Sequence, residues 1–174
     1  MDKSAKRNCC QMGWYYMKKQ IDEIMNMLDW NNDRSIQKEG LLLANQIENL
    51  DVFIQPNKFG NKAVWENCAK ILSQKSDKQL EPYLINLLEW LKDINWPGSV
   101  IILNRLKSYK GKALKPCLEY VINKTTNTNN ENDLMWLDYL SELLDNRDLI
   151  SSLSKRHLSI LKSHYHNWGY WYEQ

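Results

Sequence analysis

Apolar residues recur three or four positions apart along most of this chain, which is the spacing of one face of an α-helix. Ile21, Ile24, Met25 and Leu28 form the first such set. Seven more sets follow, with first and last members Ile36 and Ile47, Val64 and Leu72, Leu80 and Leu91, Val100 and Leu106, Leu114 and Ile122, Leu137 and Leu144, and Ile150 and Ile160. The chain also has only 6 Gly and 4 Pro, the residues that most often interrupt helices. The pattern therefore predicts an all-α protein of about eight helices.

Several residues indicate where the predicted helices begin and how they pack. Asn32 or Asp33 is suited to cap the second helix, because a short polar side chain can accept hydrogen bonds from a first turn. Gly40 lies within the apolar face of that helix, where a missing side chain lets a neighbour approach closely. Pro97 fits the first position of the fifth helix, which needs no N–H. The eighth helix is predicted over about residues 148–163.

Two segments interrupt the helical pattern. Residues 51–62 form a long connector that contains Val52, Phe53 and Ile54 before a proline, and the sequence leaves open whether it is a short strand or a packed loop. Residues 123–132 are polar and low in complexity, which predicts an exposed loop.

The middle of the chain repeats itself. Residues 72–88 align with residues 106–122 at an offset of 114 − 80 = 34 residues. The aligned pairs are Leu72 and Leu106, Leu80 and Leu114, Pro82 and Pro116, Leu84 and Leu118, Leu87 and Val121, and Leu88 and Ile122. In each copy a helix ends, a polar turn follows, and a second helix begins with a proline in its first turn. Such helix pairs cannot bury their apolar faces alone, so the repeat predicts an α-solenoid-like stack of antiparallel pairs.

The stretch from about Trp30 to Asp145 resembles a HEAT-like repeat domain of small bacterial proteins of uncharacterised function. Residues 65–72 (WENCAKIL) and 88–98 (LEWLKDINWPG) carry most of the resemblance. Some such proteins resemble immunity proteins of bacterial toxin systems, so the resemblance implies a non-catalytic protein that binds and blocks a cognate toxin.

The repeat pattern divides the chain into three parts. Residues 1–16 lack periodicity and are predicted to be a flexible leader, residues 17–163 the repeat domain, and residues 164–174 an aromatic cap or tail. There is no apolar run for a membrane span or secretion signal, and the four Cys show no CxxC spacing, which together favour a cytoplasmic protein with reduced thiols.

Composition points to an interaction surface rather than to chemistry. The chain has 8 Trp and 9 Tyr against 2 Phe, and Trp and Tyr suit half-buried ledges and interfaces. No phosphate-binding, dinucleotide-binding or nucleophile-elbow motif occurs, and the three His lack the spacing of a metal site. We therefore expect no catalytic residue, no metal and no cofactor. The buried faces of the predicted helices account for Cys68 and Cys117.

Two clusters are the candidate partner-binding residues. Trp90, Asp93, Asn95 and Trp96 are predicted to lie together at the turn between the fourth and fifth helices, where Trp can serve as a binding hot spot. Asp133, Asp138 and Glu142 are acidic positions on the seventh helix that could meet a basic partner.

The net charge of +2 does not support a wholly acidic mimic of nucleic acid. The charge is segregated, however, and a basic run follows Leu103. Two alternatives therefore remain. One is a DNA-processing protein that uses Trp65, Trp90 and Trp96 with Arg105, Lys107, Lys110 and Lys112. The other is a scaffold that self-assembles through its aromatic C-terminus; otherwise a monomer or weak homo-oligomer is expected.

Overall fold

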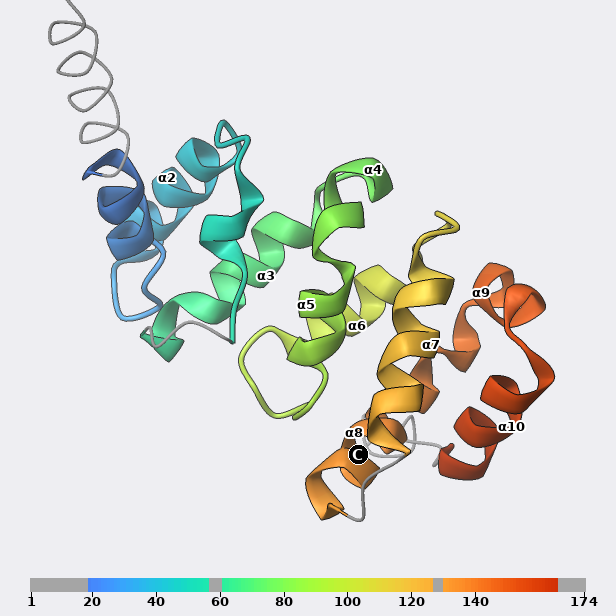
Figure 1. Cartoon of the computed structure of the whole chain (residues 1–174). Coiled ribbons are helices and arrows are strands. Elements are labelled where there is room, and N and C mark those ends of the chain that lie inside the picture. Colours follow the sequence, from blue (N-terminus) through green and yellow to red (C-terminus); the bar gives the residue numbers. More distant parts are fainter. Residues whose placement is uncertain (1–18, 57–60, 127–129, 166–174) are drawn as a thin grey trace, which may run out of the picture.

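The computed structural model describes residues 19–56, 61–126 and 130–165, and within these residues every regular element is helical (Figure 1). Residues 19–27 form the first helix, and the remaining elements follow in chain order. They are α2 (Arg34–Ala44), η1 (Leu50–Phe53), η2 (Lys62–Val64), α3 (Trp65–Ser73), α4 (Asp77–Leu80), η3 (Glu81–Tyr83), α5 (Leu84–Trp90), α6 (Ser99–Lys107), α7 (Leu114–Thr125), α8 (Glu131–Ser141), η4 (Glu142–Asp145), α9 (Arg147–Ser152) and α10 (Lys155–His164), where η marks a 3-10 turn. The predicted all-α class is confirmed.

The helices follow one another along the molecule from the N-terminal helix to α10, and they contact their neighbours in two rows (Figure 1). One row packs α3 against α6 and α6 against η4. The other packs α5 against α7 and α7 against α9. Buried side chains between the rows form one hydrophobic cluster that extends from Ile24 to Leu161.

The aligned apolar positions of the repeat are all buried in this core. All five leucine-containing pairs of the alignment, from Leu72 with Leu106 to Leu88 with Ile122, have both members buried. The prolines differ slightly in setting. Pro116 is the third residue of α7, in its first turn, whereas Pro82 lies in η3 just before α5. Because proline has no N–H to continue the α-helical ladder, it accounts for the break between α4 and α5. The sequence had predicted one helix over this stretch.

The predicted start of the fifth helix at Pro97 is wrong. The first residue of α6 is Ser99, and Gly98 precedes it as the N-cap with a φ of 82°. A Cβ on Gly98 would lie 2.5 Å from the Cβ of Ala69 on α3, so glycine permits both the left-handed backbone and the close packing of α6 on α3. Sequence spacing cannot show this, because it reflects a contact between residues far apart in the chain.

Three other predictions, about the eighth helix, Gly40 and the cap of α2, have different outcomes. The eighth helix is two helices, because Leu153 is extended and Ser154 begins α10 by accepting a hydrogen bond from the N–H of His157. Gly40 does allow close approach, since an added Cβ would lie 2.8 Å from the Cβ of Met27. The cap of α2 is Asp33, although its side chain accepts no capping hydrogen bond.

The connector after α2 is a packed loop in its described part, with η1 at its start and Phe53 and Ile54 buried. The predicted leader over residues 1–16 lies outside the described residues, and so does most of the predicted C-terminal tail, from residue 166 onward. Among the helices that the structure describes, none combines the length and the apolar character needed to cross a membrane.

Candidate functional site

The tryptophans predicted to bind a partner instead join the core. Trp90 is fully buried, and its indole N–H donates a hydrogen bond to the carbonyl of Pro97 over 3.1 Å. Trp65 meets the rings of Trp90 and Trp96 edge to face, with centroids 6.2 and 5.8 Å apart. The indole of Trp90 is therefore closed to a partner, and Trp96 is partly covered because it packs against the core.

The polar residues of the same turn shape it. The carboxylate of Asp93 accepts a hydrogen bond from the N–H of Asn95, and the carbonyl of Asp93 accepts one from the hydroxyl of Ser99. Of the four predicted residues Trp90, Asp93, Asn95 and Trp96, Asn95 is the exposed one. The turn between α5 and α6 consequently offers a partner much less surface than the sequence suggested.

The predicted acidic positions are largely engaged within the molecule. Glu142 is only 8% exposed and pairs with Lys107 at 3.0 Å, so it is not available as a surface acid. Asp138 contacts His164 at 2.8 Å and ties α10 to α8. Asp133 is half-buried in the first turn of α8. Asp133 and Asp138 lie on α8, whereas Glu142 is the first residue of η4, so the three acids do not share one helix as predicted. Asp138 and Glu142 each hold neighbouring helices together.

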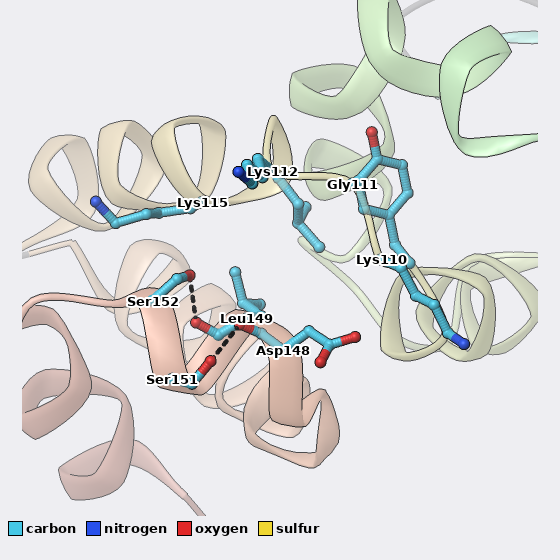
Figure 2. Close-up of a pocket in the computed structure, with 10 residues that line it drawn as sticks. Lys110, Gly111, Lys112, Lys115, Asp148, Leu149, Ser151 and Ser152 are labelled. Carbon is cyan, nitrogen blue, oxygen red and sulfur yellow. Dashed lines mark hydrogen bonds between the residues drawn. The ribbon is translucent and has the colours of Figure 1, made fainter.

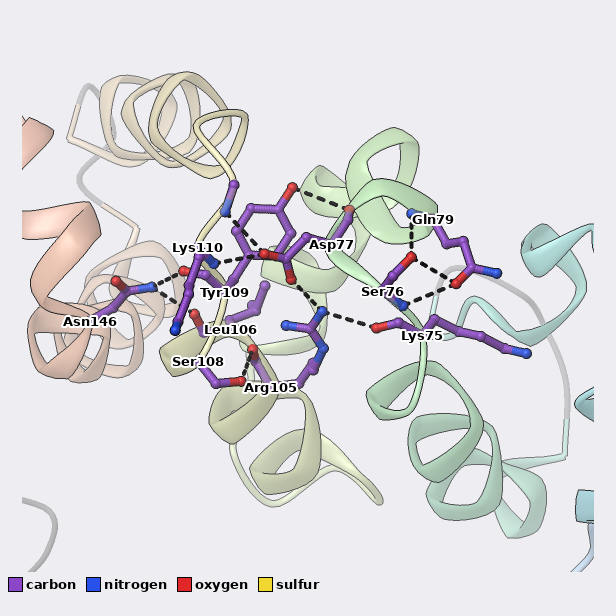
Figure 3. A network of polar contacts seen from close by, with 11 residues as sticks. Lys75, Ser76, Asp77, Gln79, Arg105, Leu106, Ser108, Tyr109, Lys110 and Asn146 are labelled. Atoms are coloured by element: carbon purple, nitrogen blue, oxygen red, sulfur yellow. Dashed lines mark hydrogen bonds and ion pairs between the residues drawn. The ribbon is translucent and has the colours of Figure 1, made fainter.

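A network of hydrogen bonds fixes the turn between α6 and α7, and Asp77 lies at its centre (Figure 3). One oxygen of its carboxylate accepts hydrogen bonds from the N–H groups of Lys110 and Gly111, at distances of 2.8 and 3.1 Å. The other oxygen pairs with the guanidinium of Arg105. From the opposite side, the amide of Asn146 donates to the carbonyls of Leu106 and Tyr109. Asp77 at the start of α4 and Asn146 at the cap of α9 thus hold this segment in place.

The charge of Asp77 follows from this network. Partial burial by itself would raise the pKa of the Asp77 carboxyl, but hydrogen bonds from Arg105, Lys110 and Gly111, with the positive charge of Arg105, lower that pKa below its ordinary value. Asp77 therefore remains ionised at neutral pH and continues to hold the turn.

An open cleft of about 370 Å³ lies between this turn and α9 (Figure 2). Lys110, Lys112 and Lys115 line one side, and Asp148, Ser151 and Ser152 of α9 line the other. Tyr109, Leu114 and Leu149 complete the cleft as its buried apolar part. Its volume is in the range of ligand-binding pockets, although its polar wall is cationic rather than mainly apolar.

The cations around the cleft differ in whether an acid neutralises them. Arg105 pairs with Asp77, Lys107 with Glu142 and Asp145, and Lys115 with Glu119. The ammonium groups of Lys110 and Lys112 are exposed and take no ion pair within the described residues. The cleft therefore presents two uncompensated positive charges on a turn whose backbone is fixed.

Burial and local hydrogen bonds determine the state of the thiol and hydroxyl groups near the cleft. The nearest thiol on α7 is Cys117, where burial, followed by the charge of Glu81, raises the pKa and so disfavours the thiolate. The hydroxyls of Ser151 and Ser152 donate to carbonyls of their own helix, those of Asp148 and Leu149 (Figure 2). Among the described residues there is no group of three or more His, Cys, Asp or Glu side chains placed to hold a metal.

Sequence reasoning found part of this cleft and missed the rest. The sequence showed the basic run that contains Lys110 and Lys112, and it left a role for this run in a DNA-processing protein open. It gave no role to Asp148, Ser151 or Ser152, because only tertiary packing brings α9 against the α6–α7 turn.

These observations define a protein that is all-helical over its described residues and has an open cationic cleft between the α6–α7 turn and α9. A family model described as "Domain of unknown function (DUF5071)" matches residues 54–170, and the chain belongs to this family. Comparison with curated proteins and comparison with solved structures each gave no match.

Proposed function

We propose that this protein is a non-catalytic helical-repeat module that binds another protein, with the cleft between the α6–α7 turn and α9 as the main contact. The observation that carries the proposal is the pair of exposed, unpaired lysines, Lys110 and Lys112, on a turn fixed by Asp77. Rigid positioning reduces the entropy that is lost when a partner binds. Two uncompensated charges beside an apolar floor favour an acidic partner segment.

A protein partner is favoured over nucleic acid by the acids around the cleft. Asp148 lies within it, and Glu119 and Asp145 pair with lysines at its edge. A continuous phosphate backbone would meet these carboxylates as well as the lysines, whereas a short acidic peptide segment can contact the lysines alone.

A narrower form of the proposal follows from the resemblance to HEAT-like bacterial proteins. The protein would act in the cytoplasm as an immunity protein, occupying a cognate toxin so that the toxin cannot act. A gene for a large secreted toxin next to the gene for this protein would identify the partner to be tested.

The test is a binding measurement with the product of such a neighbouring gene, using the wild-type chain and a Lys110→Ala/Lys112→Ala double variant. We expect the double variant to bind about tenfold more weakly, which corresponds to about 1.4 kcal/mol, because both lost charges are on the exposed rim. The control is Lys38→Ala/Lys124→Ala, which changes the net charge equally at exposed lysines of α2 and α7.

Equal loss of affinity in both double variants would contradict a role for the cleft. Tight binding to a mixed DNA and RNA pool with a steep dependence on salt would instead favour the nucleic-acid alternative. Light scattering that shows a stable oligomer, lost on removal of residues 164–174, would favour the self-assembling scaffold.

A further inference from the structure

A second cavity, of about 230 Å³, lies at the other end of the stack, between the helix of residues 19–27 and the segment that contains η1. Met25, Val52 and Val64 supply apolar walls, and Asp29, Gln55 and Asn61 supply polar groups. No candidate residue from the sequence and no part of the cationic cleft lies here.

Gln55 lines this cavity, and its side chain has an unsatisfied acceptor. The residue is 2% exposed, and its side-chain oxygen Oε1 is buried without any hydrogen-bond partner. A buried acceptor without a partner is unfavourable, so such a group in a folded protein requires an explanation. A bound donor would supply the missing hydrogen bond.

Asp29 adds a fixed negative charge to the same cavity. Its Oδ1 atom accepts hydrogen bonds from the backbone N–H and the side-chain amide of Asn31, each with a donor–acceptor distance of 2.8 Å. Its Oδ2 atom accepts one from the side-chain amide of Asn61. A carboxylate has about four acceptor positions, so about one of them is still available. The hydrogen bond from the Asn31 backbone, with those from Asn61 and Asn31 side chains, outweighs desolvation and lowers the pKa of Asp29.

We infer that this cavity binds a primary ammonium group on an unbranched aliphatic stem. The ammonium would donate hydrogen bonds to Oε1 of Gln55 and to the carboxylate of Asp29, and the stem would contact the side chains of Met25, Val52 and Val64. An ammonium has three N–H donors and no acceptor, which matches a site that offers acceptors on two side chains. Both a lysine side chain and a free alkylamine have this chemistry.

The inference is tested by titrating the full-length chain with n-pentylammonium chloride and following the amide signals by NMR. We expect saturable shifts of the Gln55 side-chain amide and of Met25, Val52 and Val64, with a dissociation constant of about 10 mM or below. Tetramethylammonium has the charge without an N–H donor, and n-pentanol has the stem without the charge. We expect neither to saturate the site.

Two substitutions at one position make the test specific. Gln55→Met keeps the length of the side chain and removes the acceptor, so pentylammonium should bind about tenfold more weakly. Gln55→Glu keeps the acceptor and adds a charge, so binding should be tighter. Gln46→Met, at an exposed glutamine after α2, is the matched control and should bind as the wild type does. Because Gln55→Met removes an unsatisfied buried acceptor, the free variant should melt at or above the wild-type temperature.

A parallel titration with Nα-acetyl-lysine methylamide distinguishes the two sources of the ligand. Binding at least as tight as that of pentylammonium assigns the site to a lysine of a protein, and binding of the free amine alone assigns it to a small molecule. The inference is overturned if shifts fail to saturate, if tetramethylammonium gives the same shifts, or if Gln55→Met binds pentylammonium as tightly as Gln46→Met. None of these results depends on the cationic cleft.

Discussion

At the residue scale, Asp77 links three parts of the chain through one carboxylate. It contacts Arg105 of α6 and the backbone N–H groups of Lys110 and Gly111 in the following turn. Replacing it removes an acceptor from donors that are partly buried, so the cost is expected to exceed that of a surface ion pair.

We predict that Asp77→Asn lowers the free energy of unfolding by about 2 kcal/mol at pH 7, measured by urea denaturation. Because the folded-state pKa of Asp77 is depressed, its contribution is complete above the unfolded-state pKa of about 3.9 and is lost as the pH falls through the folded-state value. The difference between wild type and variant should therefore shrink below about pH 4. Asp33→Asn, at the exposed cap of α2 where the side chain accepts no capping bond, is the control. A difference that stayed constant at acid pH would contradict this role.

Gly98 gives a second prediction at the same scale. Gly98→Ala would place a Cβ 2.5 Å from that of Ala69 and would strain a backbone with a φ of 82°. We expect a loss of about 2 kcal/mol or more in thermal or urea unfolding, because both effects are unfavourable. Ser108→Ala, at an exposed position after α6, should change stability by less than about 0.5 kcal/mol. Equal stability of the two variants would show that the helices readjust at Gly98.

At the element scale, the apolar spacing of residues 148–163 predicts one helix, but the structure has two, α9 and α10. The second begins after Ser154. Ser154 caps α10 by accepting from the N–H of His157, and its hydroxyl also contacts Nδ1 of the same ring. His157 is held in turn by Glu119 and Asn123 of α7. The cap therefore sets where α10 begins and places it against α7.

We predict that Ser154→Ala destabilises the protein by about 1 kcal/mol, the usual effect of removing a capping side chain. Ser163→Ala is the matched control, because Ser163 is exposed near the other end of α10 and bonds only to the carbonyl of Ile160 in its own helix. Amide hydrogen exchange should be faster in α10 of the Ser154 variant than in the control. Unchanged exchange there would mean that the contacts of His157 alone position the helix.

At the scale of the whole molecule, the hydrophobic cluster is continuous from Ile24 to Leu161. Contacts between distant elements add to it. The indole N–H of Trp136 on α8 donates a hydrogen bond to the carbonyl of Leu88 at 2.9 Å. The side-chain amide of Asn67 on α3 donates one to the carbonyl of Leu28 at 2.7 Å. These two hydrogen bonds join helices that are far apart in the sequence.

We predict a single cooperative unfolding transition for the described domain. Circular dichroism at about 222 nm, which follows helix content, should give the same midpoint as tryptophan fluorescence, to which the buried Trp65 and Trp90 contribute. Repeat arrays can lose this cooperativity when the contacts between units are weak. Two separated midpoints would show that the N-terminal pairs and the C-terminal pairs unfold independently.

The helical class, the approximate helix positions and the burial of Leu80, Leu84, Leu114 and Leu118 follow from the sequence alone, because apolar spacing along a helix determines which face is buried. The breaks at Pro82, Gly98 and Ser154 needed the structure, since each depends on backbone geometry or on a contact with a distant helix. The same holds for function. Sequence spacing placed Trp90 and Glu142 at a surface, but tertiary packing buried both and instead brought Lys110, Lys112 and α9 together. Local periodicity specifies the faces of helices, whereas tertiary packing sets exposure and charge compensation. Asp77 with Lys110 and Lys107 with Glu142 are contacts between residues more than thirty positions apart in the chain.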